Sequence, residues 1–228
     1  MNKNIILLGD SIFDNGSYVK SDEPDVTEQV QELIGEGDKV SMLAIDGGVI
    51  NDVKRQLRKL PNDTTHLVIS IGGNDAIGIL DEFSRTTRNI GDSFLKFYPS
   101  RQSFESDYIK MLNNVLSFNL PTTLCTIYHP CYSHLEKERV SGHMEYGVNS
   151  ETIQKMAMTA LPIFNDVIFQ EAVNFNLPVI DLRIIFNNES DYANPIEPSA
   201  IGGVKMSKVI KKVVYEHDFS AENTVVYK

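Results

Sequence analysis

The chain has 228 residues, of which 42% are hydrophobic, so it can bury one sizeable core and is too apolar for extensive disorder. Its 21 basic and 31 acidic side chains give a formal net charge of −10, which argues against nucleic acid or an anionic membrane as partner. No apolar run reaches the roughly 18 residues of a transmembrane helix, so we expect no stable membrane insertion. No apolar leader precedes the first predicted strand, and we expect a cytoplasmic protein.

Apolar runs and helical patterns alternate along the chain. In chain order they predict a strand over 5–8, a helix over 23–34, a strand over 40–45, a helix over 51–60 and a strand over 67–71. There follow a helix over 104–118, a strand over 122–127, a helix over 150–175 with a jog at Pro162, a strand over 177–181 and a helix over 201–215. The segment 79–100 predicts loop mixed with short helix, and 224–227 is a candidate edge strand.

This alternation predicts the fold class. Five strands separated by helices imply right-handed crossovers, and therefore an α/β fold with a five-stranded parallel sheet covered on both faces. We find no repeat, low-complexity segment or linker, so residues 1–228 are expected to form a single domain. Cys125 lies in a predicted strand and is expected to be a small core residue, because two cysteines do not make a disulfide framework.

The segments that follow the predicted strands carry the candidate chemistry. Ser11 follows the first strand, Gly47 and Gly48 follow the second, and Asn74 follows the third. Because the carboxyl ends of parallel strands meet at one edge of a sheet, we expect these residues to converge. A serine nucleophile, glycine N–H groups and an asparagine amide are the components of an oxyanion hole. A tight turn explains each glycine pair taken alone, but several such loops at one edge favour a site.

Four motifs in this order resemble the SGNH hydrolases, also called GDSL lipases and esterases, over essentially the whole chain. The motifs are Gly9-Asp10-Ser11, Gly48, Gly72-x-Asn74-Asp75 and Pro198-Ser199-Ala200 with Gly202-Gly203. The resemblance implies a flavodoxin-like three-layer α/β/α sandwich with Ser11 as nucleophile. It also implies an oxyanion hole made by the N–H groups of Ser11 and Gly48 (Gly47 is less favoured) and the Asn74 side chain. Asp75 is expected to hold its loop.

The last motif departs from the family's pattern. Where the family has Asp-x-x-His, this chain has Asn194 and Glu197. A free glutamate is a weaker base than a free histidine by roughly 3 kcal/mol, unless burial raises its pKa. The Asn194 amide is chemically able to donate a hydrogen bond to the Glu197 carboxylate, which would lower that pKa. The pair is therefore compatible but does not by itself indicate catalysis.

The histidines offer an alternative base. His129 follows the fourth predicted strand and is expected at the same edge as Ser11, whereas His66 and His217 are expected far from it. The segment 128–134 together with His143 also invites a metal site, but its spacing fits none that we can name, and a solvated loop is favoured. No cofactor and no metal are expected.

Two functions of different classes follow. The first is a serine hydrolase of esters, thioesters or acylated sugars, with Ser11 as nucleophile and Glu197 or a histidine as base. The alternative is a weak or inactive protein that binds an acyl or carbohydrate ligand in the same cleft. The first is favoured, because three oxyanion donors are an unusual set to keep for binding alone. The expected partner is thus a small-molecule ester or acylated substrate, and the oligomeric state is not predicted.

Large side chains in two long segments are candidates to line an apolar pocket beside the serine. They are Phe83, Phe94, Phe97, Tyr132, Met144 and Tyr146. Ordinary packing of long loops explains them equally well. A nucleotide-binding role is disfavoured, because the chain has neither G-x-G-x-x-G after the first strand nor a P-loop.

Overall fold

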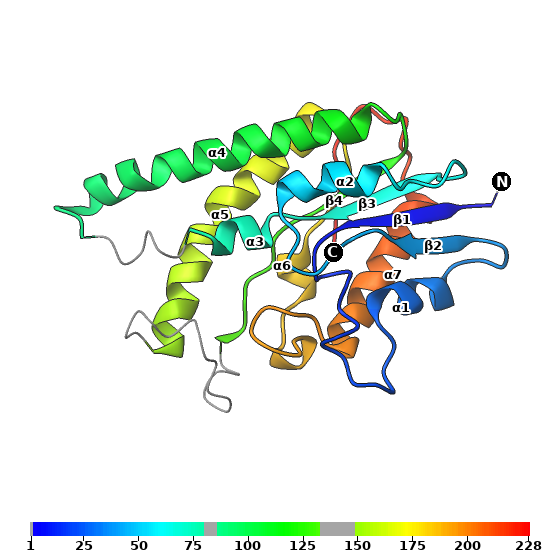
Figure 1. Cartoon of the computed structure of the whole chain (residues 1–228), viewed down its shortest axis with the longest axis horizontal. Coiled ribbons are helices and arrows are strands. Elements are labelled where there is room, and N and C mark those ends of the chain that lie inside the picture. Colours follow the sequence, from blue (N-terminus) through cyan, green and yellow to red (C-terminus); the bar gives the residue numbers. More distant parts are fainter. Residues whose placement is uncertain (1, 80–85, 133–148) are drawn as a thin grey trace.

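The central sheet has six parallel strands in the computed structural model, which describes residues 2–79, 86–132 and 149–228 (Figure 1). The strands are β1 (Asn4–Gly9), β2 (Lys39–Met42), β3 (His66–Ser70), β4 (Thr122–Cys125), β5 (Val179–Ile180) and β6 (Val226–Tyr227). Their order is β2-β1-β3-β4-β5-β6, and every neighbouring pair is parallel. The α/β class is confirmed. The expected count of five strands is one short, because the candidate segment 224–227 does pair with β5.

Helices cover both faces of this sheet (Figure 1). The described helices are α1 (Val26–Leu33), α2 (Val53–Leu57), α3 (Gly73–Ile77), α4 (Ile90–Leu116), α5 (Ser150–Asn174), α6 (Leu182–Ile185) and α7 (Ala200–Glu216), with 3-10 turns at Ile50–Asp52 and Glu189–Asp191. Among these, none is both long and apolar enough to cross a membrane.

Helix α4 differs most from expectation. The segment 79–100 predicts loop with short helix, but α4 begins at Ile90 and continues through Pro99. Asn89 caps its start by accepting a hydrogen bond from the Asp92 N–H at 2.9 Å. Further along, the Phe97 ring packs edge-on against Phe164 of α5, with 5.8 Å between the ring centroids. Capping and packing therefore outweigh the poor helix propensity of Gly91 and Pro99, on which the sequence pattern depends.

Strand β1 shows why the sheet needs two layers of helices. Its apolar side chains are fully buried, and successive ones point to opposite faces. Ile6 and Leu8 pack in one core with side chains of α2, α4 and α5. Ile5 and Leu7 pack in a second core with α1, α6 and α7. The described residues therefore form the expected three-layer α/β/α sandwich.

The strand order places a crevice at the carboxyl end of β1. Because β1 lies between β2 and β3, the chain leaves it toward one side of the sheet and later returns on the other. Helix α1 covers one face and α2 covers the opposite face. Open α/β sheets bind their ligands at this kind of switch point. The segments that follow β1, β2 and β3 converge there.

Candidate active site

Gly9, the last residue of β1, lets the ends of β1 and β3 come together. Its φ of 137° is one that other residues rarely adopt, and an added Cβ would lie 1.7 Å from the Ser70 carbonyl oxygen. Gln56 of α2 is 1% exposed and holds Gly9 on both sides of its backbone. The Gly9 N–H donates to Gln56 Oε1 at 2.8 Å, and Gln56 Nε2 donates to the Gly9 carbonyl at 2.7 Å. Sequence reasoning missed Gln56, whose only signal is a polar side chain within a helix that faces the sheet.

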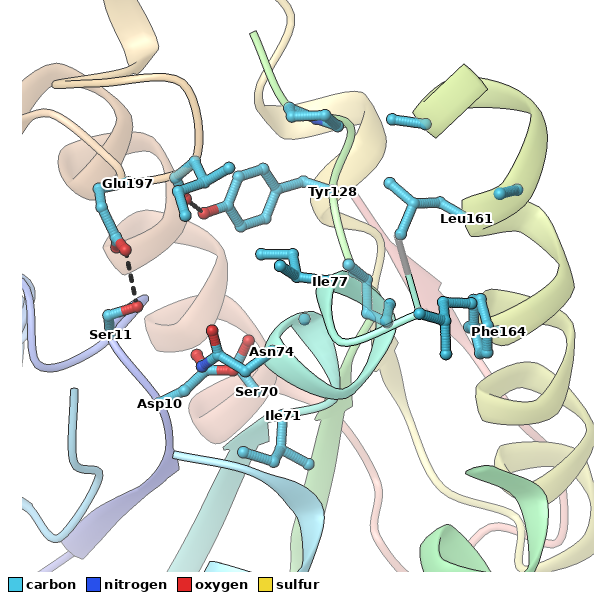
Figure 2. A pocket seen from close by; sticks show the side chains of 18 of the residues that line it. Asp10, Ser11, Ser70, Ile71, Asn74, Ile77, Tyr128, Leu161, Phe164 and Glu197 are labelled. Atoms are coloured by element: carbon cyan, nitrogen blue, oxygen red, sulfur yellow. Dashed lines mark hydrogen bonds between the residues drawn. The ribbon is translucent and has the colours of Figure 1, made fainter. Parts of the chain in front are cut away.

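Ser11 and Glu197 meet directly, although 186 positions separate them. The Ser11 Oγ donates a hydrogen bond of 2.9 Å to Glu197 Oε1 (Figure 2). Both residues are buried, at 8% and 4% exposure. The structure thus brings the serine of the first motif within hydrogen-bond distance of the glutamate of the last one.

The loop that carries Glu197 is fixed by hydrogen bonds to its backbone. Asn194 Oδ1 accepts from the N–H groups of Ile196 and Glu197, at 3.0 Å each. The Tyr128 hydroxyl donates to the Ile196 carbonyl. Asn15, another residue that the sequence did not single out, donates from Nδ2 to the Pro198 carbonyl at 3.4 Å and so links this loop to the one after β1.

Asn194 therefore supports the loop rather than the carboxylate. The hydrogen bond expected from its amide to the Glu197 carboxylate is not formed, because its side chain turns toward backbone N–H groups. Within the described ranges, Glu197 Oε2 is buried without a hydrogen-bond partner.

The environment makes Glu197 a stronger base than an ordinary glutamate. Burial raises its pKa from 4.5 to about 7, the Ser11 hydrogen bond lowers it, and the negative charge of Asp46 raises it. Burial thus brings the pKa of this carboxyl group close to that of an unperturbed histidine, which is near 6.5.

Gly48 and Asn74 lie next to the serine loop, but their donors are partly engaged. An added Cβ on Gly48 would lie 2.9 Å from the Gly9 carbonyl oxygen, so a larger residue does not fit. The Gly48 N–H, however, already donates to the Ile45 carbonyl at 2.9 Å. Asn74 Nδ2 donates one hydrogen to the Gly48 carbonyl at 2.9 Å. Of these candidate oxyanion donors, the Ser11 N–H and the second amide hydrogen of Asn74 have no hydrogen-bond partner among the described residues.

Asp75 has the structural position expected of it. Its Oδ2 accepts a hydrogen bond of 3.1 Å from the Ile50 N–H, which ties the loop after β3 to the loop after β2. Gly47, the less favoured oxyanion donor, has a φ of 72° and forms the turn before Gly48.

No described histidine lines the pocket beside Ser11. The ring of His129 is half-buried. Burial and the positive charge of Arg183 lower its pKa, whereas the negative charge of Asp181 raises it. His66 is the first residue of β3, at the opposite edge of the sheet from Ser11, as expected. His217 follows α7 and lies 3.0 Å from the Tyr227 hydroxyl.

The remaining sequence candidates have simple outcomes. Cys125 is a buried free thiol in the core, as expected, and Cys131 is half-buried. His134 and His143 of the suggested metal segment lie outside the described residues. Among the residues that are described, no three His, Cys, Asp or Glu side chains come together as metal ligands.

An apolar pocket extends from Ser11 and Glu197 between α3 and α5 (Figure 2). Its apolar lining consists of Ile71, Ala76, Ile77, Ile79, Ile127, Tyr128, Pro130, Tyr132, Ala157, Ala160, Leu161, Phe164 and Ile196. Of the predicted lining residues, Tyr132 takes part, whereas Phe94 and Phe97 line a neighbouring groove between α4 and α5. Phe83, Met144 and Tyr146 lie outside the described residues.

Comparison with known proteins relates this architecture to solved structures. No protein-family model matches the chain, and no curated protein matches it. An extracellular lipase from Streptomyces rimosus superposes with a TM-score of 0.61 and 14% identity, over 89% of this chain and 95% of the lipase. The acetyl xylan esterase AlAXEase superposes with a TM-score of 0.63 and 16% identity, over 92% of this chain and 99% of the esterase.

A third solved structure is a psychrotrophic esterase, EstA, from Pseudoalteromonas sp., inhibited by monoethylphosphonate. It gives a TM-score of 0.59 and 14% identity, over 93% of this chain and 99% of the esterase. These likenesses extend over nearly the full length of both partners. This chain therefore has the fold of the GDSL-like lipases and esterases, as its motifs indicate.

Proposed function

We propose that this chain is a carboxylic ester hydrolase that uses Ser11 as nucleophile and Glu197 as general base. The observation that carries the proposal is the 2.9 Å hydrogen bond from Ser11 Oγ to Glu197 Oε1 beside an apolar pocket. The lipases and esterases that share the fold support this class of reaction.

Glu197 is suited to accept the serine proton near neutral pH. A general base works best when its pKa lies near the working pH, and burial raises that of Glu197 to about 7. As Ser11 Oγ adds to the substrate carbonyl, its proton passes to Oε1. The neutral Glu197 then returns the proton to the departing alcohol. In the second half of the reaction, a water molecule attacks the acyl-serine and Glu197 accepts the water's proton. The bond between the acyl carbon and Ser11 Oγ then breaks, and Glu197 gives the proton back to Oγ as the acid leaves.

Hydrogen-bond donors stabilise the negative charge that forms on the carbonyl oxygen. A histidine that accepts a proton becomes a cation and offsets this charge, but a glutamate becomes merely neutral. The oxyanion donors must therefore supply more of the stabilisation. The proposed donors are the Ser11 N–H and the unpaired amide hydrogen of Asn74. Gly48 contributes the close backbone fit, and its N–H takes part only if it shares its hydrogen with the Ile45 carbonyl.

The substrate class follows from the lining of the pocket. Ile77, Leu161 and Phe164 offer hydrocarbon surface in the pocket that Ser11 also lines, which suits the acyl chain of an ester. Each methylene group that leaves water contributes roughly 0.8 kcal/mol, about a fourfold gain in binding. We therefore expect kcat/KM to rise with acyl chain length until the pocket is full.

Hydrolysis of p-nitrophenyl esters, from acetate to octanoate, tests this function. Wild-type rates are expected to rise with pH through about 7 as Glu197 ionises, and Ser11→Ala to be inactive. Glu197→Gln keeps a hydrogen-bond acceptor but is not a base, so it is expected to lose about 10²-fold to 10⁴-fold in kcat. Full activity in Ser11→Ala refutes the proposal. Saturable ligand binding without any Ser11-dependent turnover would support the ligand-binding alternative instead.

A further inference from the structure

One buried acid of the pocket has no part in the reaction described so far. Asp10 is 7% exposed and lines the pocket beside Ser11. Its Oδ1 accepts a hydrogen bond of 3.2 Å from the Ile12 N–H, and the backbone N–H of Asp10 itself also acts on the carboxyl group, whereas no described side chain donates to it. Oδ2 points toward the start of α3, since a Cβ added to Gly73 would lie 3.8 Å from it. The Asp10 side chain thus lies on the Asn74 side of the pocket (Figure 2).

The surroundings of Asp10 favour its neutral form. Burial raises the pKa of Asp10 from 3.8 to about 8, the Ile12 hydrogen bond lowers it, and the charges of Glu197 and Asp75 raise it further. The other titratable groups that interact with Asp10 are the Cys125 thiol and the Tyr128 hydroxyl, and both are neutral at neutral pH because burial raises their pKa. No described Lys, Arg or His lines the pocket to hold a carboxylate there. At neutral pH the Asp10 carboxyl group is therefore a hydrogen-bond donor.

The proposed oxyanion hole needs such a donor. The Gly48 N–H is engaged with the Ile45 carbonyl, and one hydrogen of the Asn74 amide is engaged with the Gly48 carbonyl. A carboxylic acid that an apolar site keeps neutral can donate to an oxyanion, and hydrogen bonds to charged acceptors are about twice as strong as neutral ones.

We propose that the neutral Asp10 carboxyl group donates a hydrogen bond from Oδ2 to the oxyanion formed when Ser11 adds to the substrate. This inference rests on the proposed function. The Ser11 Oγ–carbon bond forms, the serine proton moves to Glu197, and the carbonyl π electrons move to the oxygen, which Asp10 binds without transferring its proton. On collapse the C=O bond re-forms, the bond to the leaving oxygen breaks, and Glu197 protonates that oxygen.

The test measures kcat and KM for a p-nitrophenyl ester between about pH 6 and about pH 10, which spans the ionisation of Asp10. Wild-type activity is expected to fall as the pH rises through about 8, because ionised Asp10 can no longer donate. Asp10→Asn keeps a neutral donor, so it should stay within about tenfold of wild type at neutral pH and lose the alkaline decline. Asp10→Ala removes the donor and should lower kcat about 10²-fold to 10³-fold with little change in KM.

Asp75→Asn is the matched control. It neutralises another, partly buried acid whose pKa burial raises, but Asp75 does not line the pocket. The alkaline decline should therefore persist, moved to somewhat lower pH because the charge of Asp75 no longer raises the pKa of Asp10. The assignment is overturned if Asp10→Asn declines with pH as wild type does, or if folded Asp10→Ala is fully active. Where Asp10→Ala does not fold, the pH profile of Asp10→Asn decides. Activity that survives Ser11→Ala refutes the proposed function itself, whereas Ser11-dependent activity that is indifferent to Asp10 refutes only this inference.

Discussion

Replacing Glu197 with glutamine should stabilise the fold relative to wild type, and this gain in the free energy of unfolding should increase as the pH rises. Because burial raises the pKa of Glu197 from 4.5 to about 7, the folded chain binds this proton more tightly than the unfolded chain does. The resulting stability is fully present below about pH 4.5 and is lost as the pH rises through about 7. At about 1.4 kcal/mol per pH unit, this interval corresponds to about 3 kcal/mol. Glutamine has no charge to bury, so Glu197→Gln does not incur this loss.

Urea unfolding of wild type and Glu197→Gln at about pH 5 and about pH 8 measures the effect. The free-energy difference between the two proteins should grow by about 2 to 3 kcal/mol in favour of the variant between these pH values. For a chain of this size, this corresponds to a difference of roughly 5 to 10 °C in Tm. Comparing the two pH values cancels any fixed cost of the new amide, including a buried N–H without a partner. An equal difference at both values refutes the reasoning that Glu197 is a buried, weakly acidic carboxyl group.

Three further predictions concern the supports of the site and its pocket. Asn194→Ala should lower kcat about 10-fold to 100-fold by loosening the loop that carries the base, whereas Asn194→Asp keeps both acceptor bonds and should retain most activity in the same ester assay. Gln56→Ala leaves the buried N–H and carbonyl of Gly9 without partners and should lower the free energy of unfolding by about 2 to 4 kcal/mol in urea. Ala160→Leu fills part of the pocket and should lower kcat/KM for the octanoate ester but not for the acetate ester. Thr159→Leu adds bulk outside the pocket that contains Ser11 and should leave kcat/KM for both esters unchanged. Equal effects of the two variants would contradict the assignment of the acyl chain to this pocket.

The sequence predicts the sheet and the convergence of the site well, because both follow from strong local signals. Alternating buried strands and helices leave few topologies, and parallel strands necessarily bring their carboxyl ends to one edge. That edge is where Ser11, Asn74 and Glu197 come together. The raised pKa of Glu197, by contrast, depends on a burial that the sequence pattern leaves open.

The features that sequence patterns miss depend on contacts between distant residues. The start of α4 depends on a cap and on the contact between Phe97 and Phe164. A local sequence pattern does not show that contact, and Pro99 in the same pattern argues against a helix. The engagement of the Gly48 N–H within its own turn is a matter of backbone geometry. Gln56 looks like any polar helical residue until Gly9 is placed against it.

The absence of an imidazole from the described lining of the pocket separates two classes of inhibitor. Organophosphorus reagents form a bond to the serine oxygen and need only an activated hydroxyl group, which in the proposed mechanism is Ser11 hydrogen-bonded to Glu197. Chloromethyl ketones trap serine hydrolases by alkylating the ring nitrogen of the catalytic histidine, and diethyl pyrocarbonate acylates the same nitrogen. A carboxylate base offers neither reagent that target, so the proposed enzyme should be inactivated by the first class and resist the second.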